Sequence, residues 1–295
     1  MGEYITLEQE RQWGWGWNAE AVNLMLHDVL TCMDASSFLG FRLWDFSFRS
    51  LRRQYALTFL HSIVLRHPLR TWRGVLKHGR FRRQHKDLHD VTLLFEGSEE
   101  ELVRALCQAK TGLLVAVGFC QKPLNPMCPA QRPNHDCVYL GSVDLSTGGQ
   151  VAHAACQGCD IRMLGTLALR AGACMHVMTS ALDIARDVMI PSANRGRFRN
   201  VILCLCPYSV RAIDLPLTIC GLEGYLFGYA SGNCGNYEQW LRADQGFKNE
   251  RTTLDSAARA RVVWLLERIV EARASEGLCY TKFQRQGNIY EPVLT

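Results

Sequence analysis

Short apolar runs alternate with helical patterns from residue 91 onward, and this alternation predicts an α/β domain. Apolar runs predict strands at residues 91–95, 111–119, 173–178, 200–206 and 215–220. Apolar residues at helical spacing predict helices at residues 98–109, 161–170, 179–188 and 254–275. Ser98 followed by Glu101 forms the capping-box pair that marks a helix start. The strand–helix–strand order favours a mostly parallel sheet with flanking helices and right-handed crossovers.

The first 88 residues have a different pattern, and we expect them to form a helical, basic N-terminal extension. One helix is expected at residues 18–33. Two basic helices follow within residues 40–86, broken at Arg66-His67-Pro68 because proline suits the first turn of a helix. The second is expected to end at Gly79. Residues 89–295 then form a cysteine-rich α/β domain.

Positive charge is concentrated in this extension. Residues 41–86 hold twelve Lys and Arg residues and one acidic residue, while the whole chain carries a net charge of only +5. Such a segment fits a solvated helix face, an anionic membrane surface, a nucleic acid backbone or an acidic protein partner. Arginine binds phosphate and carboxylate through paired hydrogen bonds. We therefore assign partner binding to Arg52, Arg53, Arg70, Arg73, Arg82 and Arg83.

Cysteine content and apolar run length bear on the compartment. The 13 cysteines are many for a cytosolic chain but too sparse for a small disulfide-stapled scaffold, and no signal-peptide pattern opens the sequence. No apolar run approaches the roughly 20 residues that a membrane span requires. We expect reduced cysteines and a cytoplasmic protein, with the basic helices able to hold it at the membrane periphery.

Four cysteines form the strongest candidate site. Cys128, Cys137, Cys156 and Cys159 follow the pattern C-x8-C-x18-C-x2-C. A close C-x2-C pair lets two thiolates hold one metal centre, and the two upstream cysteines can complete a four-thiolate site. Only one short knuckle is present, which favours an iron–sulfur cluster over zinc. The first two cysteines lie in a proline-rich loop, residues 120–150, that a metal would order. The alternative is four unconnected buried thiols.

A second group of residues is expected where the predicted strands end. Parallel sheets place ligand sites beyond the carboxyl ends of their strands, so Cys204, Cys206 and Cys220 are candidates for thiol catalysis. Cys234, in the next glycine-rich loop, is a candidate ligand of a second metal. Thr179 and Ser180 open a helix directly after a strand, and its free N–H groups could bind an anion together with Arg197. For these residues, buried core positions and a simple helix cap are the alternatives.

The stretch from Cys156 to Asn236 resembles an uncharacterised, cysteine-rich prokaryotic family known only as a domain of unknown function. The matching residues are Cys156-x-x-Cys159-Asp-Ile161, Gly172, Thr179, Ile184-Ala185, Cys204-x-Cys206 and Gly232-Asn-Cys234-Gly-Asn236. The family pattern has further cysteines immediately before the C-x2-C pair, and this chain lacks them. The resemblance implies a metal- or cluster-binding α/β unit.

Three functions fit these patterns. The leading one is an iron–sulfur or other thiolate-metal protein of cytoplasmic redox or sulfur metabolism, with thiol chemistry at the strand ends. The second is a zinc-stabilised protein whose basic helices bind nucleic acid. The third is a metal-free thiol enzyme, which predicts one unusually reactive cysteine.

Overall fold

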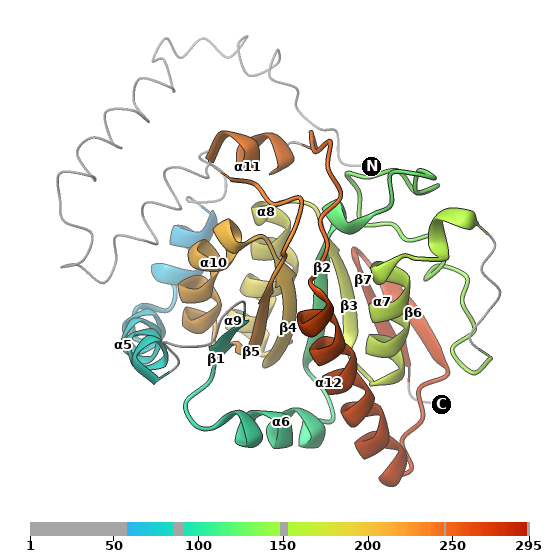
Figure 1. Cartoon of the computed structure of the whole chain (residues 1–295). Helices are drawn as coiled ribbons and strands as arrows, with labels where there is room; N and C mark the ends of the chain where they lie inside the picture. Colours follow the sequence, from blue (N-terminus) through green and yellow to red (C-terminus); the bar gives the residue numbers. More distant parts are fainter. Residues whose placement is uncertain (1–57, 85–90, 148–152, 236, 245, 294–295) are drawn as a thin grey trace.

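A seven-stranded mixed sheet forms the centre of the described part of the chain (Figure 1). The computed structural model describes residues 58–84, 91–147, 153–235, 237–244 and 246–293. The strands are β1 (Val91–Leu94), β2 (Leu113–Gly118), β3 (Cys174–Met178), β4 (Asn200–Leu205), β5 (Glu223–Gly228), β6 (Lys282–Gln286) and β7 (Ile289–Val293).

The strand order is β1-β5-β4-β2-β3-β7-β6. The four central strands, β5, β4, β2 and β3, are parallel to one another. β1 adds antiparallel to β5 on one edge, and the β6–β7 hairpin adds antiparallel to β3 on the other. Every residue of β4 is buried, as expected for a central parallel strand with both faces covered.

Helices cover both faces of the sheet (Figure 1). On one face α12 packs against α6 and α7; on the other α10 packs against α5 and the sheet. The helical segments are a π-helical turn at Leu60–Val64, α5 (Pro68–Gln84), α6 (Glu99–Gln108), α7 (Asp160–Arg170), α8 (Ala181–Asp183), a π-helical turn at Ile184–Met189, α9 (Ile190–Arg195), α10 (Pro207–Ile219), α11 (Tyr237–Asp244) and α12 (Ser256–Ser275). Short 3₁₀ turns occur at Phe119–Gln121 and Ala154–Cys156.

The predicted α/β class is confirmed, together with most of the predicted elements between residues 91 and 206. The Ser98–Glu101 capping box is present at the start of α6. The predicted interruption of the helix before Pro68 and the predicted final helix, at Ser256–Ser275, are also confirmed. The helix expected at residues 18–33 and most of the basic extension lie outside the described residues.

One predicted element and one predicted boundary are wrong. The strand expected at residues 215–220 is the second half of α10, with Pro216 inside the helix. This half is buried nearly all round, so its apolar run hides the helical period. The helix starting at Pro68 does not stop at Gly79 but continues to Gln84. Within the described residues, no helix is long and apolar enough to cross a membrane.

Candidate functional site

The carboxyl ends of four parallel strands meet at one edge of the sheet, below α11 in Figure 1. A cavity of about 90 Å³ opens there, lined by residues at or just beyond the ends of β2, β3, β4 and β5. Trp240 and Ala243 of α11 complete its wall. Because open α/β sheets bind ligands at this edge, the cavity is the first candidate site.

Four cysteines line this cavity, and three of them, Cys120, Cys206 and Cys234, interact with one another; we call these three the thiol triplet. The Cys206 side chain hydrogen-bonds to both Cys120 and Cys234. The Thr252 hydroxyl donates to Cys120 Sγ over 3.1 Å. The Lys248 ammonium donates to Cys234 Sγ over 3.5 Å. The three thiols therefore interact in the order Cys120, Cys206, Cys234. Thr252 donates to the first of them and Lys248 to the last.

The three thiols differ in acidity because these hydrogen bonds act on them in opposite directions. The pKa of Cys120 is lowered below that of an ordinary thiol, chiefly by the hydrogen bond from Cys206, although burial opposes the shift. The hydrogen bond to Cys120 is the largest cause raising the pKa of Cys206 to about 11. The pKa of Cys234 is raised, first by its hydrogen bond to Cys206. Cys120 is thus the member of the triplet that ionises most readily.

Several backbone contacts hold Cys120 in place. It sits in the 3₁₀ turn Phe119–Gln121 directly after β2. Its carbonyl oxygen accepts hydrogen bonds from the Thr252 backbone N–H at 3.0 Å and from the buried Arg132 guanidinium at 3.1 Å. A Cβ at Gly118 would lie 3.0 Å from Cys120 Sγ, so glycine at that position leaves room for the thiol.

The remaining cysteines predicted at the strand ends are placed differently. Cys204 lines the same cavity as Cys206, but it is fully buried and burial raises its pKa to about 12. The predicted placement of Cys220 is wrong, because it is the C-cap of α10. That helix leads back to the start of β5, so Cys220 lies near the amino-terminal ends of the parallel strands, opposite the cavity. Cys120 was missed by the sequence analysis; its signal was its position directly after the apolar run at residues 111–119.

The four cysteines of the C-x8-C-x18-C-x2-C pattern come together around a second, smaller cavity of about 10 Å³. Cys128 and Cys137 come from the proline-rich loop, Cys156 ends a 3₁₀ turn, and Cys159 is the N-cap of α7. Cys137 also feels the charges of the other three electrostatically. We call Cys128, Cys137, Cys156 and Cys159 the four-cysteine group. Cys234, predicted to join Cys204 and Cys206 at the strand ends, lies with them in the lining of the first cavity.

A buried lysine lines the same small cavity. Lys122 is 1% exposed, and its ammonium donates to the carbonyl oxygens of Gln131 and Asn134 at 2.9 Å each and to the Asn134 side chain. Burial lowers the pKa of Lys122 to about 8, opposed by the thiols of Cys128 and Cys137. An ammonium at this position would offset the negative charge of neighbouring thiolates.

The thiols of the four-cysteine group favour the protonated form. Burial raises the pKa of Cys137 to about 12 and raises those of Cys156 and Cys159. The N–H groups of Ile161 and Arg162, at the start of α7, act in the opposite direction on Cys159. Among the residues that the structure describes, no three His, Cys, Asp or Glu side chains stand in the arrangement of a metal centre. The donor set fits a thiophilic metal, but the thiols would have to draw closer and lose protons to bind it.

The three residues predicted to bind an anion do not come together. Ser180 caps α8 by accepting a hydrogen bond from the Asp183 N–H at 3.2 Å, and the Thr179 hydroxyl donates to the Asp183 carboxylate. A carboxylate therefore already occupies this helix start. Arg197 lies just before β4, at the opposite edge of the sheet, and forms an ion pair with Glu291. Thr179, Ser180 and Arg197 thus all make contacts within the chain, and they do not form a common anion site.

Two histidines and two aspartates form a further cluster beside Thr179. The His135 and His176 rings stack with centroids 5.4 Å apart. His135 Nε2 lies 3.5 Å from Asp183, and His176 Nε2 lies 3.6 Å from Asp187. Burial is the main cause that lowers the pKa of His176 to about 3. The sequence analysis missed this cluster, because its members are spread from residue 135 to residue 187 with no motif spacing.

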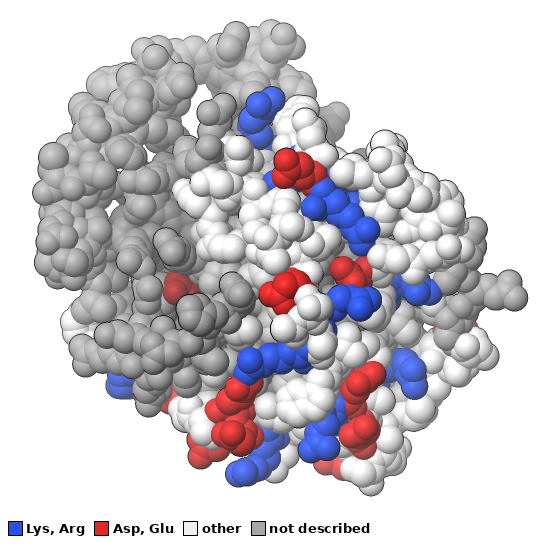
Figure 2. Space-filling model, in the orientation of Figure 1, with Lys and Arg blue, Asp and Glu red and all other residues white. Residues whose placement is uncertain are grey.

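Partner-binding arginines are only partly placed by the structure. Arg52 and Arg53 lie outside the described residues, while Arg70, Arg73, Arg82 and Arg83 lie on α5. Arg70 donates to the Ala193 carbonyl oxygen, whereas Arg73 is exposed. An exposed apolar stripe runs along the same segment, formed by Leu65, Leu69, Trp72 and Leu76. On the face seen in Figure 2, acidic and basic side chains lie side by side over α6 and α12.

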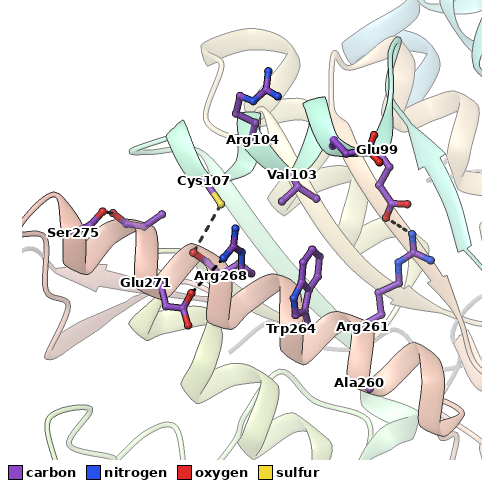
Figure 3. Close-up of a pocket in the computed structure, with 12 residues that line it drawn as sticks. Glu99, Val103, Arg104, Cys107, Ala260, Arg261, Trp264, Arg268, Glu271 and Ser275 are labelled. Carbon is purple, nitrogen blue, oxygen red and sulfur yellow. Dashed lines mark hydrogen bonds and ion pairs between the residues drawn. The ribbon is translucent and has the colours of Figure 1, made fainter.

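A large groove between α6 and α12 is a weaker candidate (Figure 3). Arg261 pairs with Glu99 across it, and Arg268 pairs with Glu271 along α12. Its cysteine, Cys107, is made less acidic by burial, which raises its pKa. The groove lies on a face of the sheet rather than at the strand ends, and four of its six charged lining side chains pair with each other instead of pointing at a common centre.

Comparison of the chain with protein-family models, with curated proteins and with solved structures gave no match. The candidate sites are therefore interpreted from their own geometry and chemistry.

Proposed function

We propose that this protein is a thiolate-metal protein of redox or sulfur metabolism in which Cys128, Cys137, Cys156 and Cys159 bind an iron–sulfur cluster, with zinc as the alternative metal. One observation carries the proposal: four cysteines from separate segments line one cavity. Such convergence is unusual for unrelated buried thiols, which more often pack among apolar side chains.

Local structure supports thiolate ligands at this position. Cys159 sits at the N-terminus of α7, where the N–H groups and the helix dipole favour negative charge. The Arg162 guanidinium lowers the pKa of Cys156, although burial outweighs it. Lys122 adds a buried ammonium to the lining of the cavity. Together these groups would offset part of the charge that four thiolates bring into a buried site.

The residues around the cavity would set how the centre behaves. A bound cluster would supply one-electron transfer, whereas zinc would only fix the loop. Cys137 is held by a hydrogen bond from its backbone N–H to the Tyr290 hydroxyl, at 2.9 Å. Lys122 fixes residues 131–134 of the loop and keeps its ammonium beside the thiols. These contacts hold Cys137 and residues 131–134 of the loop beside the cavity.

Anaerobic purification followed by an absorption spectrum and metal analysis tests the proposal. Iron with acid-labile sulfide supports the cluster, and stoichiometric zinc in a colourless protein supports the alternative metal. Cys156→Ser and Cys159→Ser should each lose the metal, while Cys279→Ser, which changes an exposed cysteine outside the group, should retain it. A folded protein without iron or zinc would contradict the proposal.

We propose in addition that α5 attaches the protein to an anionic membrane surface. The apolar stripe and the neighbouring Arg66 and Arg73 are exposed together on this segment. Apolar side chains flanked by arginine are typical of helices that lie in the lipid headgroup region. A nucleic acid partner, the alternative, would use the arginines but gives no reason for Leu69 and Trp72 to be exposed.

A further inference from the structure

We propose that the thiol triplet is a dithiol–disulfide exchange site in which Cys120 attacks a low-molecular-weight disulfide and Cys206 resolves the product. This activity is separate from the four-cysteine group and does not require its metal. The proposal rests on the cavity at the strand ends, on which of the three thiols interact with each other, and on the residues that line the cavity.

The lining of the cavity limits the reaction class. Apart from cysteines, the only ionisable side chains among its described lining residues are Tyr229 and Lys248. None of these lining residues is His, Asp or Glu, the usual general bases that activate a cysteine for acyl transfer. Thiol–disulfide exchange needs no such base once the attacking sulfur is a thiolate. Three linked thiols are therefore better suited to exchange than to hydrolysis.

The positions of the sulfurs assign their roles. Cys120 is the member of the triplet to which a hydroxyl donates: the Thr252 side chain donates to Cys120 Sγ at 3.1 Å, and this hydrogen bond stabilises the Cys120 thiolate. Cys206 lines the same cavity and interacts with the Cys120 thiol, so it is placed to attack that sulfur once a mixed disulfide has formed. Cys234 hydrogen-bonds to Cys206 and is itself in contact with the Lys248 ammonium. We assign Cys234 and Lys248 as positioning residues that stabilise the Cys206 thiolate as it forms.

The reaction balances with a disulfide as the oxidant. The Cys120 thiolate attacks one substrate sulfur, a new S–S bond forms, the substrate S–S bond breaks, and the first product leaves as a thiolate. Cys206 then gives up its proton and attacks Cys120 Sγ, which releases the second product. Two electrons pass from the protein to the substrate, the two protein thiol protons end on the two thiol products, and a Cys120–Cys206 disulfide remains. A low-molecular-weight dithiol returns the pair to the reduced form and is itself oxidised.

The cavity also indicates the size of the substrate. A volume of about 90 Å³, walled by Phe119, Ile184, Ile213 and Trp240, holds one short and largely apolar arm of a disulfide. A bulky peptide disulfide would not fit beside Cys120. We therefore choose hydroxyethyl disulfide, which is small and uncharged, as the probe.

The test incubates the reduced full-length protein with limiting hydroxyethyl disulfide and maps the modified cysteines by mass spectrometry. The wild-type protein should yield a Cys120–Cys206 disulfide, with two molecules of free thiol product for each such disulfide formed. In Cys206→Ser the reaction should stop at a mixed disulfide on Cys120. In Cys120→Ser the rate at which the thiol product is released should fall to that of the Cys279→Ser, Cys120→Ser double variant. Modification confined to Cys279 or to the four-cysteine group would overturn the proposal.

Two further measurements keep the test independent of folding and of the metal. Limited alkylation of the wild-type protein should label Cys120 before Cys204 and Cys234, and equal labelling would contradict the assignment of Cys120 even if the variants do not fold. Metal content should be unchanged in Cys120→Ser. Loss of the metal from Cys156→Ser with retained exchange at Cys120 would show that the two sites are separate.

Discussion

At the scale of single residues, the acidity of Cys120 depends in part on the Thr252 hydroxyl. Thr252 donates to Cys120 Sγ and helps to lower its pKa, although the interaction with Cys206 has the larger effect. The charge of Lys248 also lowers this pKa, whereas that of Cys234 raises it. Thr252→Val keeps the shape of the side chain but removes the donor. The pKa of Cys120 should rise, and its alkylation at neutral pH should slow about tenfold, the loss expected for one hydrogen bond to a charged atom.

The measurement for Thr252→Val is the rate of Cys120 alkylation as a function of pH, followed by peptide mapping. The midpoint of the wild-type profile should lie below that of an ordinary thiol, and the midpoint of the variant should lie higher. Thr252→Ser retains the hydroxyl and should restore the wild-type profile. A profile that is the same for Thr252→Val and the wild type would show that the hydroxyl does not stabilise the thiolate.

A second residue, His176, should make the protein sensitive to acid. Its ring is fully buried, and burial lowers its pKa from 6.5 to about 3, so the native state favours the neutral ring. The associated stability is complete above pH 6.5 and is lost as the pH falls from 6.5 towards 3. Below pH 6.5 the free energy of unfolding should therefore decrease by about 1.4 kcal/mol per pH unit from this group alone.

Replacing His176 isolates this contribution. His176→Leu removes the titrating ring, so its free energy of unfolding, measured by urea denaturation, should fall less steeply between pH 6 and pH 4 than that of the wild type, as the linkage relation requires. Asp187 keeps a hydrogen bond from Asn288 at 2.8 Å in the variant. His61→Gln, at an exposed position, should leave the wild-type slope unchanged. Parallel pH profiles for His176→Leu and the wild type would contradict the assignment.

At the scale of elements, α5 carries the proposed membrane contact. Trp72 is 63% exposed on α5, and Trp264 on α12 is 47% exposed and serves as a matched control. Trp72→Ala should reduce binding to vesicles that contain phosphatidylserine about tenfold, because burial of a large apolar side chain contributes at least roughly 1.5 kcal/mol. Trp264→Ala should not change binding.

Cosedimentation with vesicles of phosphatidylserine and of phosphatidylcholine alone measures this effect. Binding should be strong only to the anionic vesicles and should weaken with salt. Equal binding by Trp72→Ala and Trp264→Ala would contradict the proposal. Salt-sensitive binding to single-stranded RNA, unaffected by Trp72→Ala, would instead favour the nucleic acid alternative.

The elements also show what the sequence could predict. β2 and β4 are continuous apolar runs buried on both faces, and α6 starts at a capping box, so each has a strong local signal. β6 is exposed at an edge and polar, so it has no such signal. β5 contains Gly224, where a Cβ would lie 1.9 Å from the Val201 carbonyl oxygen of the neighbouring strand. The close approach of two backbones requires that glycine, but in the sequence it resembles a turn residue.

The same limit applies to the candidate sites. The four-cysteine group could be identified because its C-x2-C pair is local, and the structure places all four cysteines around one cavity. The thiol triplet combines residues 120, 206 and 234, and only the sheet topology brings these three together. Cys220 was assigned to the wrong edge because its segment was predicted as a strand rather than as the end of α10.

At the scale of the whole molecule, one short segment joins the two cysteine groups. Cys120 belongs to the thiol triplet, and Lys122, two residues later, lines the cavity of the four-cysteine group. Arg132 bridges the loop to this segment by donating to the carbonyl oxygens of Cys120 and Glu250. Arg251 donates to the carbonyl oxygens of Gln121, at 3.1 Å, and Gly158, at 3.0 Å. A change at one cysteine group can therefore alter the other through residues 119–122.

This connection leads to a prediction about the loss of the metal. Cys159→Ser should release the proline-rich loop and weaken the contacts of Lys122 and Arg132 with it, because a loop of this length needs cross-links to stay ordered. Hydrogen exchange should then increase in residues 119–137, and Cys120 should be alkylated faster than in the metal-loaded wild type. Exchange in the central strands β2 and β4 should not change. Cys279→Ser, which leaves the four-cysteine group intact, should match the wild type in both measurements. If Cys159→Ser loses the metal while exchange in residues 119–137 stays at the wild-type level, the two groups are mechanically independent despite their shared segment.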